Sequence, residues 1–225
     1  MTIYKNLVKI NGFSSSQKKI LELARDGDVL EIGASSGYMT KIFSENNHGV
    51  DVIEIDKSAA QEASIFATEV LIGSIEDENV QKKITKKYNF IICADVLEHL
   101  VNPDIVLSFL KTKLKKGGVI LISIPNIACW NMRVDLFRGK FEYKDSGLLD
   151  KTHLRFYTYY SFLNLLKNCG FVIENIFPTQ TKIPLEYSLL KLPIIGKIFV
   201  DLFKSFLLKK CPNLIISHYV IQVKV

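Results

Sequence analysis

The chain has 225 residues, of which 48% are hydrophobic, and a formal net charge of +6. This length and composition suit one large domain whose sheet is buried on both faces. Its four cysteines form no Cys-x-x-Cys pair or zinc-ligand cluster, which favours free thiols and a cytoplasmic protein. Residues 1–19 lack the apolar core of a signal peptide, and no apolar run is long enough to span a membrane, so neither is expected.

Apolar runs and helical patterns alternate through the first half of the chain. Runs without polar alternation are typical of parallel strands that are buried on both faces. We predict strands over 28–32, 50–55, 69–72, 88–94 and 119–124. Helices are predicted over 37–45, over 102–114 and after Ser58, which is the expected N-cap of its helix.

The second half begins with an aromatic, charged and irregular segment over 126–157. Thr158 is the predicted N-cap of a helix that ends at Gly170, and a strand follows over 171–177. Residues 178–213 are predicted to form an insert before a last strand over 214–225. Seven lysines and two acidic residues lie in residues 178–225, which therefore hold most of the net positive charge.

The insert contains an amphipathic helical pattern over 194–210. One side carries apolar residues (Ile194, Ile195, Ile198, Phe199, Leu202, Phe203 and Phe206), and the other is polar (Lys197, Asp201, Lys204 and Ser205). Three roles are open for this helix. It can pack on its own protein, which we favour, form the seam of a homodimer, or lie on an anionic membrane as a peripheral contact.

The most informative stretch runs from Val29 to Tyr38, where an apolar strand pattern leads through Glu31 into a loop of small residues. Such a loop lets the backbone approach a ligand where a Cβ atom would collide. Asp56 follows the next strand, and its carboxylate can accept two hydrogen bonds from a ribose diol. The two features predict a nucleoside-bearing cofactor at the edge of a parallel sheet.

Motifs in a fixed order carry a family resemblance: the loop over 31–37, Asp56, and the segments 73–76, 94–100 and 114–119. Together they resemble a class I S-adenosylmethionine (SAM)-dependent methyltransferase over roughly residues 20–177. The resemblance implies one α/β domain over 1–225, with a doubly wound, Rossmann-like sheet of seven strands. The sheet is expected to be mostly parallel with its last strand antiparallel, and residues 126–157 are expected to form a substrate lid.

The same resemblance implies the residues that bind SAM, with Glu54 as an alternative to Asp56 at the ribose. They are Glu31, Gly33, Ala34, Ser35, Gly37, Tyr38, Asp56, Lys57, Ser74, Ile75, Asp95 and Val96. Two of them depart from the family pattern. Ser35 replaces a glycine and is expected to fit only with a negative φ, and Ser74 replaces an aspartate. Both departures are expected to weaken cofactor binding.

His153 is the predicted general base, because a pKa near ~6.5 suits proton abstraction around neutrality. Asp150 is expected to orient it and Arg155 to hold an anionic group of the substrate, with His99 as a second catalytic candidate. The alternative for His153 is a packed histidine that fixes the loop. Trp130 and Tyr157 belong to an aromatic belt that binds the substrate or covers a small subdomain.

A similarity to quinone-type O-methyltransferases raises the question of a metal. It suggests Asp95, Glu98 and His99 as ligands of a divalent cation. Many members of the wider family carry the Glu-His pair without metal, so our sequence prediction is that no metal is bound.

A narrower resemblance, carried by residues 141–143, 147–158 and 169–171, is to a branch tied to surface polysaccharide, sugar or quinone-type chemistry. We therefore predict O-methylation of a sugar or of a glycan or lipid-linked intermediate. The alternatives are a quinone-type O-methyltransferase and a non-enzymatic protein that binds nucleic acid or a cofactor. The glycine spacing does not fit the Gly-x-Gly-x-x-Gly of a dehydrogenase. Nucleic acid is disfavoured because the lysines are not interleaved with aromatic residues.

Overall fold

The computed structural model describes residues 12–46, 48–181, 183, 186–191 and 193–225. The expectation about a signal peptide concerns residues 1–19, of which 1–11 lie outside this range. Among the described residues, no helix is both long and apolar enough to cross a membrane.

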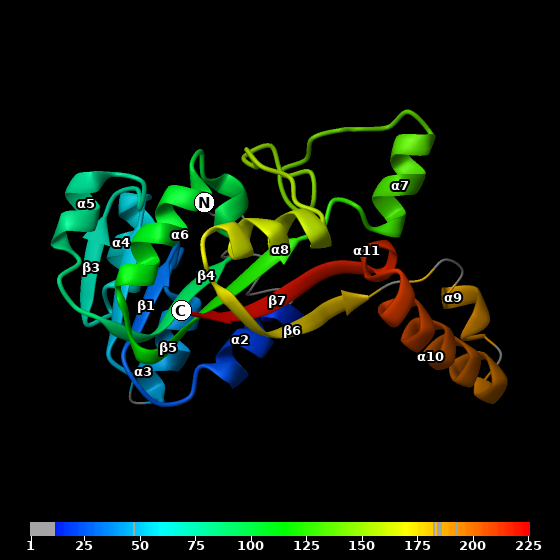
Figure 1. The fold of residues 1–225 in the computed structure, drawn as a ribbon, viewed down its shortest axis with the longest axis horizontal. Coiled ribbons are helices and arrows are strands. Elements are labelled where there is room, and N and C mark those ends of the chain that lie inside the picture. The colour runs from blue at the N-terminus through cyan, green and yellow to red at the C-terminus, as the bar shows by residue number, and fades with distance from the viewer. Residues whose placement is uncertain (1–11, 47, 182, 184–185, 192) are drawn as a thin grey trace.

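One sheet of seven strands forms the centre of the molecule (Figure 1). Its strands, in the spatial order β3-β2-β1-β4-β5-β7-β6, are β3 (Glu69–Ile72), β2 (Val50–Glu54), β1 (Val29–Ile32), β4 (Tyr88–Ala94), β5 (Leu114–Pro125), β7 (Ile216–Lys224) and β6 (Val172–Thr181). Strands β1 to β5 pair in parallel, whereas β7 is antiparallel to both β5 and β6. The predicted fold class is therefore confirmed.

Helices cover both faces of the sheet (Figure 1). One apolar layer joins the sheet to α2 (Ser15–Leu23), α3 (Tyr38–Glu45) and α4 (Lys57–Ala63), and the other joins it to α5 (Glu78–Lys83), α6 (Pro103–Thr112) and α8 (Tyr159–Asn168). Alternate residues of β5 enter opposite layers: Leu121 lies in the first, and Ile120 and Ile122 lie in the second. This alternation explains why residues 119–122 of β5 form a continuous apolar run.

Two helix caps test the local predictions. Thr158 caps α8 and forms a reciprocal capping box with Ser161, as its position predicted. The N-cap of α4 is Asp56, whose Oδ1 accepts a hydrogen bond from the amide of Ala59 at 2.9 Å. The prediction of Ser58 as this cap was wrong, because the helix begins one residue after Asp56 and places Ser58 inside its first turn.

The segment over 126–157 contains a helix, α7 (Trp130–Phe137), so the prediction of a wholly irregular segment was wrong. Figure 1 shows α7 standing away from the sheet on long connections. Cys129, Met132 and Leu149 form a small apolar cluster of their own within this segment. The segment therefore folds as an appendage beside the sheet, which is compatible with the predicted lid.

Strands β6 and β7 are joined by α9 (Glu186–Leu189), α10 (Pro193–Lys210) and α11 (Pro212–Ile215), which project from the sheet (Figure 1). Strand β6 continues to Thr181, so the helical insert begins later than residue 178. Helix α10 buries Val200 and Leu207, in line with packing on its own protein.

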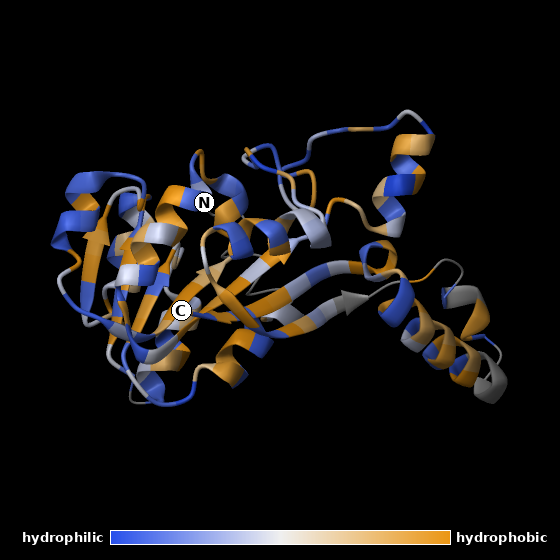
Figure 2. Ribbon diagram, in the orientation of Figure 1, coloured by the Kyte–Doolittle hydropathy of each residue, from blue (hydrophilic) through white to orange (hydrophobic). Residues whose placement is uncertain are grey.

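The other side of α10 leaves large apolar side chains exposed, namely Ile198, Phe199, Leu202, Phe203 and Phe206. Figure 2 shows hydrophobic and hydrophilic residues interspersed along this helix. The side chains of Ile194 and Ile195, which belong to the predicted apolar side, lie outside the described part of the structure. The favoured prediction, packing on its own protein, thus accounts for only part of the apolar surface.

Candidate cofactor and acceptor site

The strand order reverses at β1, which lies between β2 and β4. In open parallel sheets, ligands bind in the crevice beyond the carboxyl ends of the strands at such a point. Three acidic residues occupy these ends here: Glu31 on β1, Glu54 at the end of β2, and Asp95 just after β4. The fold therefore gathers carboxylates from the ends of three strands.

Glu31 is buried, and its Oε2 accepts a hydrogen bond of 2.6 Å from the Thr40 hydroxyl on α3. Burial raises the pKa of Glu31 to about 7, and the nearby charge of Glu54 acts in the same direction, while the bond from Thr40 partly opposes it. The group is therefore poised to change charge near neutrality. A cationic ligand beside it would favour the ionised form.

Glu54 links the loop after β1 to the loop after β2. Its Oε2 accepts the amide of Ser35 at 2.7 Å, and its Oε1 accepts the amide of Asp56 at 2.9 Å. Each carboxylate oxygen has a second lone pair, so hydroxyl groups of a ribose can still bind there. Asp56, our first sequence choice for the ribose, uses Oδ1 to cap α4.

Ser35 adopts a left-handed conformation with φ of +52°, so the expectation of a negative φ was wrong. This left-handed backbone conformation is strained for a serine. Its buried Oγ has no hydrogen-bond partner among the described residues. An orphaned hydroxyl in this loop is consistent with a polar ligand that binds against it.

The glycines of the loop have their own structural reasons. Gly37 has a φ of +77°, and a Cβ atom there would lie 2.6 Å from the Cα atom of Ala63 on α4. Gly33 has a φ of +70°, and a Cβ atom there would lie 3.0 Å from the Val96 side chain. Both positions need glycine for the backbone and for packing, so their presence does not by itself demonstrate a bound cofactor.

Tyr38 lies near the three acidic residues Glu31, Glu54 and Asp95. Its hydroxyl accepts a hydrogen bond of 3.1 Å from the Gln17 side chain on α2. Burial raises the pKa of Tyr38, and the negative charges of Glu31, Asp95 and Glu54 raise it further. Helix α2 is therefore linked to the start of α3 beside these carboxylates.

Asp95 follows β4 with a φ of +56°, a second left-handed residue that is not glycine. Its Oδ1 accepts hydrogen bonds from the Ser123 hydroxyl on β5 at 2.6 Å and from His218 Nε2 on β7 at 2.7 Å. Burial works to raise the pKa of Asp95, but the charge of His218 and these hydrogen bonds outweigh it and hold the pKa below its usual value. Burial likewise works to lower the pKa of His218, and Asp95 raises it overall.

His218 is the site residue that sequence reasoning missed. It lies within the last strand beside Ile216, Tyr219 and Val220. A histidine inside a mostly apolar strand was the only signal, and nothing in the local pattern connected it to Asp95.

The remaining predicted cofactor residues line the same edge. Ser74 accepts the amide of Glu76 at 3.1 Å in the turn after β3, and Ile75 beside it is buried. Ala34 is buried in the loop, Lys57 is exposed in the first turn of α4, and Val96 precedes η1 (Leu97–His99). The Ser74 hydroxyl therefore stabilises the turn by accepting this hydrogen bond.

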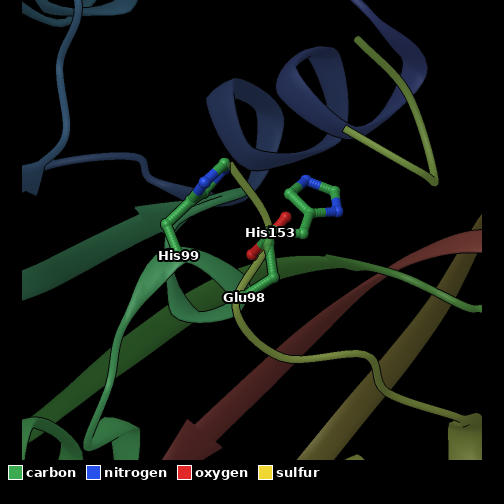
Figure 3. Close-up of side chains that lie close together, drawn as sticks. All are labelled: Glu98, His99 and His153. Carbon is green, nitrogen blue, oxygen red and sulfur yellow. The ribbon is translucent and has the colours of Figure 1, made fainter. Parts of the chain in front are cut away.

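A second polar group forms where the segment over 126–157 meets η1. The structure brings together Glu98, His99 and His153, and Figure 3 shows the three side chains gathered at one point. The two imidazole rings lie edge to face with centroids 4.7 Å apart. Burial raises the pKa of Glu98 well above its usual value and lowers the pKa of His153, which the charge of His99 lowers further.

The other predicted catalytic and substrate-binding residues each have contacts of their own, and they do not all belong to this group. The Asp150 carboxylate accepts hydrogen bonds from the Thr152 amide and hydroxyl, and the Arg155 guanidinium donates to the carbonyl of Val101 at 2.5 Å. Tyr157 packs edge to face on Phe162 of α8, and Trp130 begins α7. Tyr157 therefore contributes to the core beside α8, and its pKa is raised to about 12, mainly by burial.

Comparison with known proteins places the chain in a family. A family model described as a methyltransferase domain matches residues 12–176. An uncharacterised protein of Methanocaldococcus jannaschii is 32% identical over 164 residues, which cover 69% of this chain and 68% of that protein. The ubiquinone biosynthesis O-methyltransferase of Rickettsia canadensis is 26% identical over 101 residues, which cover 44% of this chain and 43% of that enzyme.

The chain spans about half the length, or less, of the ubiquinone biosynthesis relatives that it matches. Among solved structures, a SAM-dependent methyltransferase from Thermotoga maritima superposes with a TM-score of 0.64 at 16% identity. The match covers 99% of this chain and 94% of that one. With the family match over most of the chain, we conclude that the protein belongs to the class I SAM-dependent methyltransferases.

Proposed function

We propose that the protein transfers the methyl group of SAM to a hydroxyl oxygen of a small molecule, a sugar or a glycan or lipid-linked intermediate. The observation that carries the proposal is the group of acidic residues at the strand ends. In a chain of net charge +6, Glu31, Glu54 and Asp95 converge on one edge of the sheet. SAM carries an ammonium group, a ribose diol and a positively charged sulfur, and that sulfur supplies the reactive methyl group.

The residues present suit this cofactor. Glu31 would hold the ammonium group, and the orphaned hydroxyl of Ser35 gives the loop an unused polar contact. Glu54 is our proposed ribose ligand, with Asp56 beside it, and Ser74 and Ile75 would flank the adenine. Gly33, Ala34, Gly37, Tyr38, Lys57 and Val96 would complete the cradle.

Asp95 would lie beside the methionine part of the bound SAM. His218 and Ser123 hold its carboxylate ionised and fix its direction. A fixed negative charge near a cationic donor aligns the donor without competing as a mobile nucleophile. The sequence-based set of cofactor residues therefore gains His218 as a positioning residue.

The acceptor would lie under the lid segment over 126–157. Arg155 and the cluster at η1 belong to this side of the site, with Glu98 almost fully buried. Methyl transfer requires an in-line approach with water excluded, and a lid provides this exclusion. Because the acceptor is proposed to be a hydroxyl, its proton must be removed at this polar group.

The exposed side chains of helix α10 support the proposal that the acceptor is located at a membrane. Its exposed apolar side chains include Phe199, Leu202 and Phe206, and Lys197, Lys209 and Lys210 are exposed on the same helix. Lys204 is instead paired with Glu186 at 2.6 Å. An apolar face with neighbouring lysines suits the surface of an anionic membrane, where it would bring the enzyme to a lipid-linked acceptor.

A quinone precursor is the second candidate acceptor. The relatives named as ubiquinone biosynthesis O-methyltransferases favour it, although the matched regions span about half of those enzymes or less. Such precursors are also membrane lipids that carry a hydroxyl group. The two candidates therefore share the reacting atom and differ in the ring that bears it.

Two measurements test the proposed function. Calorimetry with S-adenosylhomocysteine should detect a single binding site. Transfer of a radiolabelled methyl group from SAM is then measured with a nucleotide sugar, a polyprenyl-linked sugar and a polyprenyl catechol. Labelling of either sugar supports the first candidate, and labelling of the catechol supports the second. If S-adenosylhomocysteine does not bind, the proposed activity is wrong.

A further inference from the structure

Glu98 is a buried carboxylic acid without a partner. Its side chain is in a residue that is 1% exposed, and neither carboxylate oxygen has a hydrogen-bond partner among the described residues. Buried polar groups are normally hydrogen-bonded, and an unpaired buried charge is strongly destabilising. The position therefore calls for a ligand that the side chains around it do not supply.

The tautomer of His99 follows from its hydrogen bonds. The Thr152 hydroxyl donates to Asp150 Oδ1 at 2.7 Å, so it must act as an acceptor toward His99 Nδ1, which lies 3.1 Å away. The Thr152 carbonyl oxygen, also 3.1 Å from Nδ1, can only accept. Nδ1 of His99 therefore carries the proton, and the lone pair of the neutral ring is on Nε2.

His153 is held in the same way. Its Nδ1 lies 3.2 Å from the carbonyl oxygen of Leu148, so Nδ1 is again the donor and Nε2 carries the lone pair. Histidines that ligate metals usually donate their other ring nitrogen to a carbonyl or carboxylate, which fixes the ring and its tautomer. Both rings of this cluster already have that second contact.

One potential ligand atom from each of Glu98, His99 and His153 lies within 4.8 Å of the others (Figure 3). We propose that these three side chains bind a divalent transition-metal ion such as Zn²⁺. Two imidazoles and one carboxylate suit zinc and its neighbours, whereas Mg²⁺ prefers oxygen ligands throughout. Asp95, a ligand considered from sequence, is already engaged by Ser123 and His218.

The ion would join the lid segment to η1, which follows β4. Glu98 and His99 come from η1, and His153 comes from the lid segment. The amides of Leu154 and Arg155 already donate to the Glu98 carbonyl oxygen, each at 2.9 Å. A metal at this junction adds a second connection between the same two segments, so their contact is stabilised whenever the metal is bound.

The metal also changes the expected role of His153. A ring whose Nε2 ligates the ion cannot accept a proton there, so this assignment replaces the predicted general base. Three protein ligands leave a coordination position open, and an acceptor hydroxyl bound to the ion would lose its proton more readily. This last consequence, unlike metal binding itself, rests on the proposed function.

The test uses the full chain after treatment with a chelator. Co²⁺ is titrated while its visible absorption is recorded, and Zn²⁺ is added to displace it. We expect one Co²⁺ per chain with an absorption typical of nitrogen ligation, displacement by Zn²⁺, and no competition from Mg²⁺. Thermal unfolding should shift to higher temperature with Zn²⁺, because the ion binds only the folded chain.

Matched variants identify the ligands. Glu98→Gln keeps the shape of the side chain, and His153→Ala removes a ring; both should abolish the cobalt absorption and the zinc-dependent thermal shift. Thr152→Val removes the hydroxyl that holds His99 and should weaken binding by about 10- to 100-fold. His48→Ala is the control and should bind normally, because His48 contacts the carbonyl of Gly27 outside the cluster.

Absence of Co²⁺ and Zn²⁺ binding in the wild-type chain would overturn the proposal, as would unchanged binding in both Glu98→Gln and His153→Ala. Far-ultraviolet circular dichroism of each variant provides an independent check of folding, and calorimetry with S-adenosylhomocysteine is measured separately. Metal binding in a chain that fails to bind S-adenosylhomocysteine would support this site and contradict the proposed function. The two proposals can therefore fail separately.

Discussion

His218 on β7 and Asp95 after β4 form an ion pair with 2.7 Å between Nε2 and Oδ1, although they are 123 residues apart in the chain. Ser123 on the intervening strand β5 donates to the same Asp95 oxygen. The pair exists because β7 enters the sheet antiparallel beside β5, which aligns His218 with Pro125 near the end of that strand. The last strand thus completes a site that the earlier loops begin.

The His218→Asn substitution should lower the free energy of unfolding most at mildly acidic pH, where Asp95 and His218 are both charged. The folded-state pKa of Asp95 is lowered, so its contribution is present above its ordinary pKa and is lost as pH falls through the lowered value. The pKa of His218 is raised, so its contribution is present below ~6.5 and is lost as pH rises through the raised value.

The ion pair therefore contributes most between roughly pH 4 and 6.5. The Asp95 side chain is 35% exposed, which screens the pair, so we expect a loss of about 1 kcal/mol in unfolding free energy near pH 5.5. Denaturant unfolding of wild type and His218→Asn across pH measures this difference. A loss that is equally large near pH 9 would contradict an electrostatic role.

Glu31 should make the ligand-free protein less stable as pH rises. Its folded-state pKa is raised from 4.5 to about 7, so the unfolded chain loses this proton first and stability falls between those values. The full effect is about 3 kcal/mol. Glu31→Gln removes it, so the variant should match wild type near pH 4 and exceed it in unfolding free energy above pH 7.

Binding of S-adenosylhomocysteine provides a second measurement on Glu31. Its ammonium group should favour the ionised carboxylate, so binding near neutral pH should release a proton. Calorimetry in buffers of different ionisation enthalpy counts that proton. The same binding enthalpy in every buffer, for wild type and for Glu31→Gln, would show that Glu31 does not sense the ligand.

The acidic residues after β2 can be distinguished by conservative changes. Glu54→Gln should weaken S-adenosylhomocysteine binding by roughly tenfold or more, because a charged acceptor of the ribose is lost. Asp56→Asn should have a smaller effect, because asparagine is an equally good N-cap for α4. Calorimetry gives both affinities. If Asp56→Asn loses more affinity than Glu54→Gln, Asp56 is the ribose ligand, as the sequence first suggested.

Ser35→Gly should stabilise the ligand-free protein by up to about 1 kcal/mol. Glycine tolerates the φ of +52° without strain, although it adds entropy to the unfolded chain. Ser35→Ala is the matched control, since it keeps the strain but removes the orphaned hydroxyl. If that hydroxyl contacts the cofactor, both variants lose affinity for S-adenosylhomocysteine. An unstabilised glycine variant would argue against strain at this position.

Helix α10 should bind anionic vesicles through its exposed apolar side. Leu202→Ser combined with Phe206→Ser should reduce co-sedimentation with such vesicles by at least about tenfold, because apolar surface is lost from the contact. High salt should weaken wild-type binding by screening the lysines. Ile105→Ser on α6 is the control, as Ile105 is 60% exposed elsewhere. Vesicle binding unaffected by the α10 changes would favour another role, such as a homodimer seam, which sedimentation velocity detects.

Several elements were predictable because their signals are local. Strands β3 and β4 have the predicted bounds, and Thr158 caps α8 as expected. Burial within the sheet leaves a continuous apolar run over residues 90–94 of β4, and a cap needs only side chains within a turn of the helix. The α4 cap shows the limit of such signals, because Asp56 and Ser58 compete within one turn and only the folded backbone selects Asp56.

The sequence by itself determined the order of strands and helices, the family resemblance and the acidic residues at the strand ends, because each depends on neighbouring residues. Only the tertiary structure decided the left-handed φ of Ser35, the hydrogen bond that its amide donates to Glu54, the pairing of Asp95 with His218, and the meeting of Glu98 and His99 with His153. These features depend on contacts between loops that are distant in the chain. Residue periodicity reports which face of an element is buried, but not which distant side chain it meets.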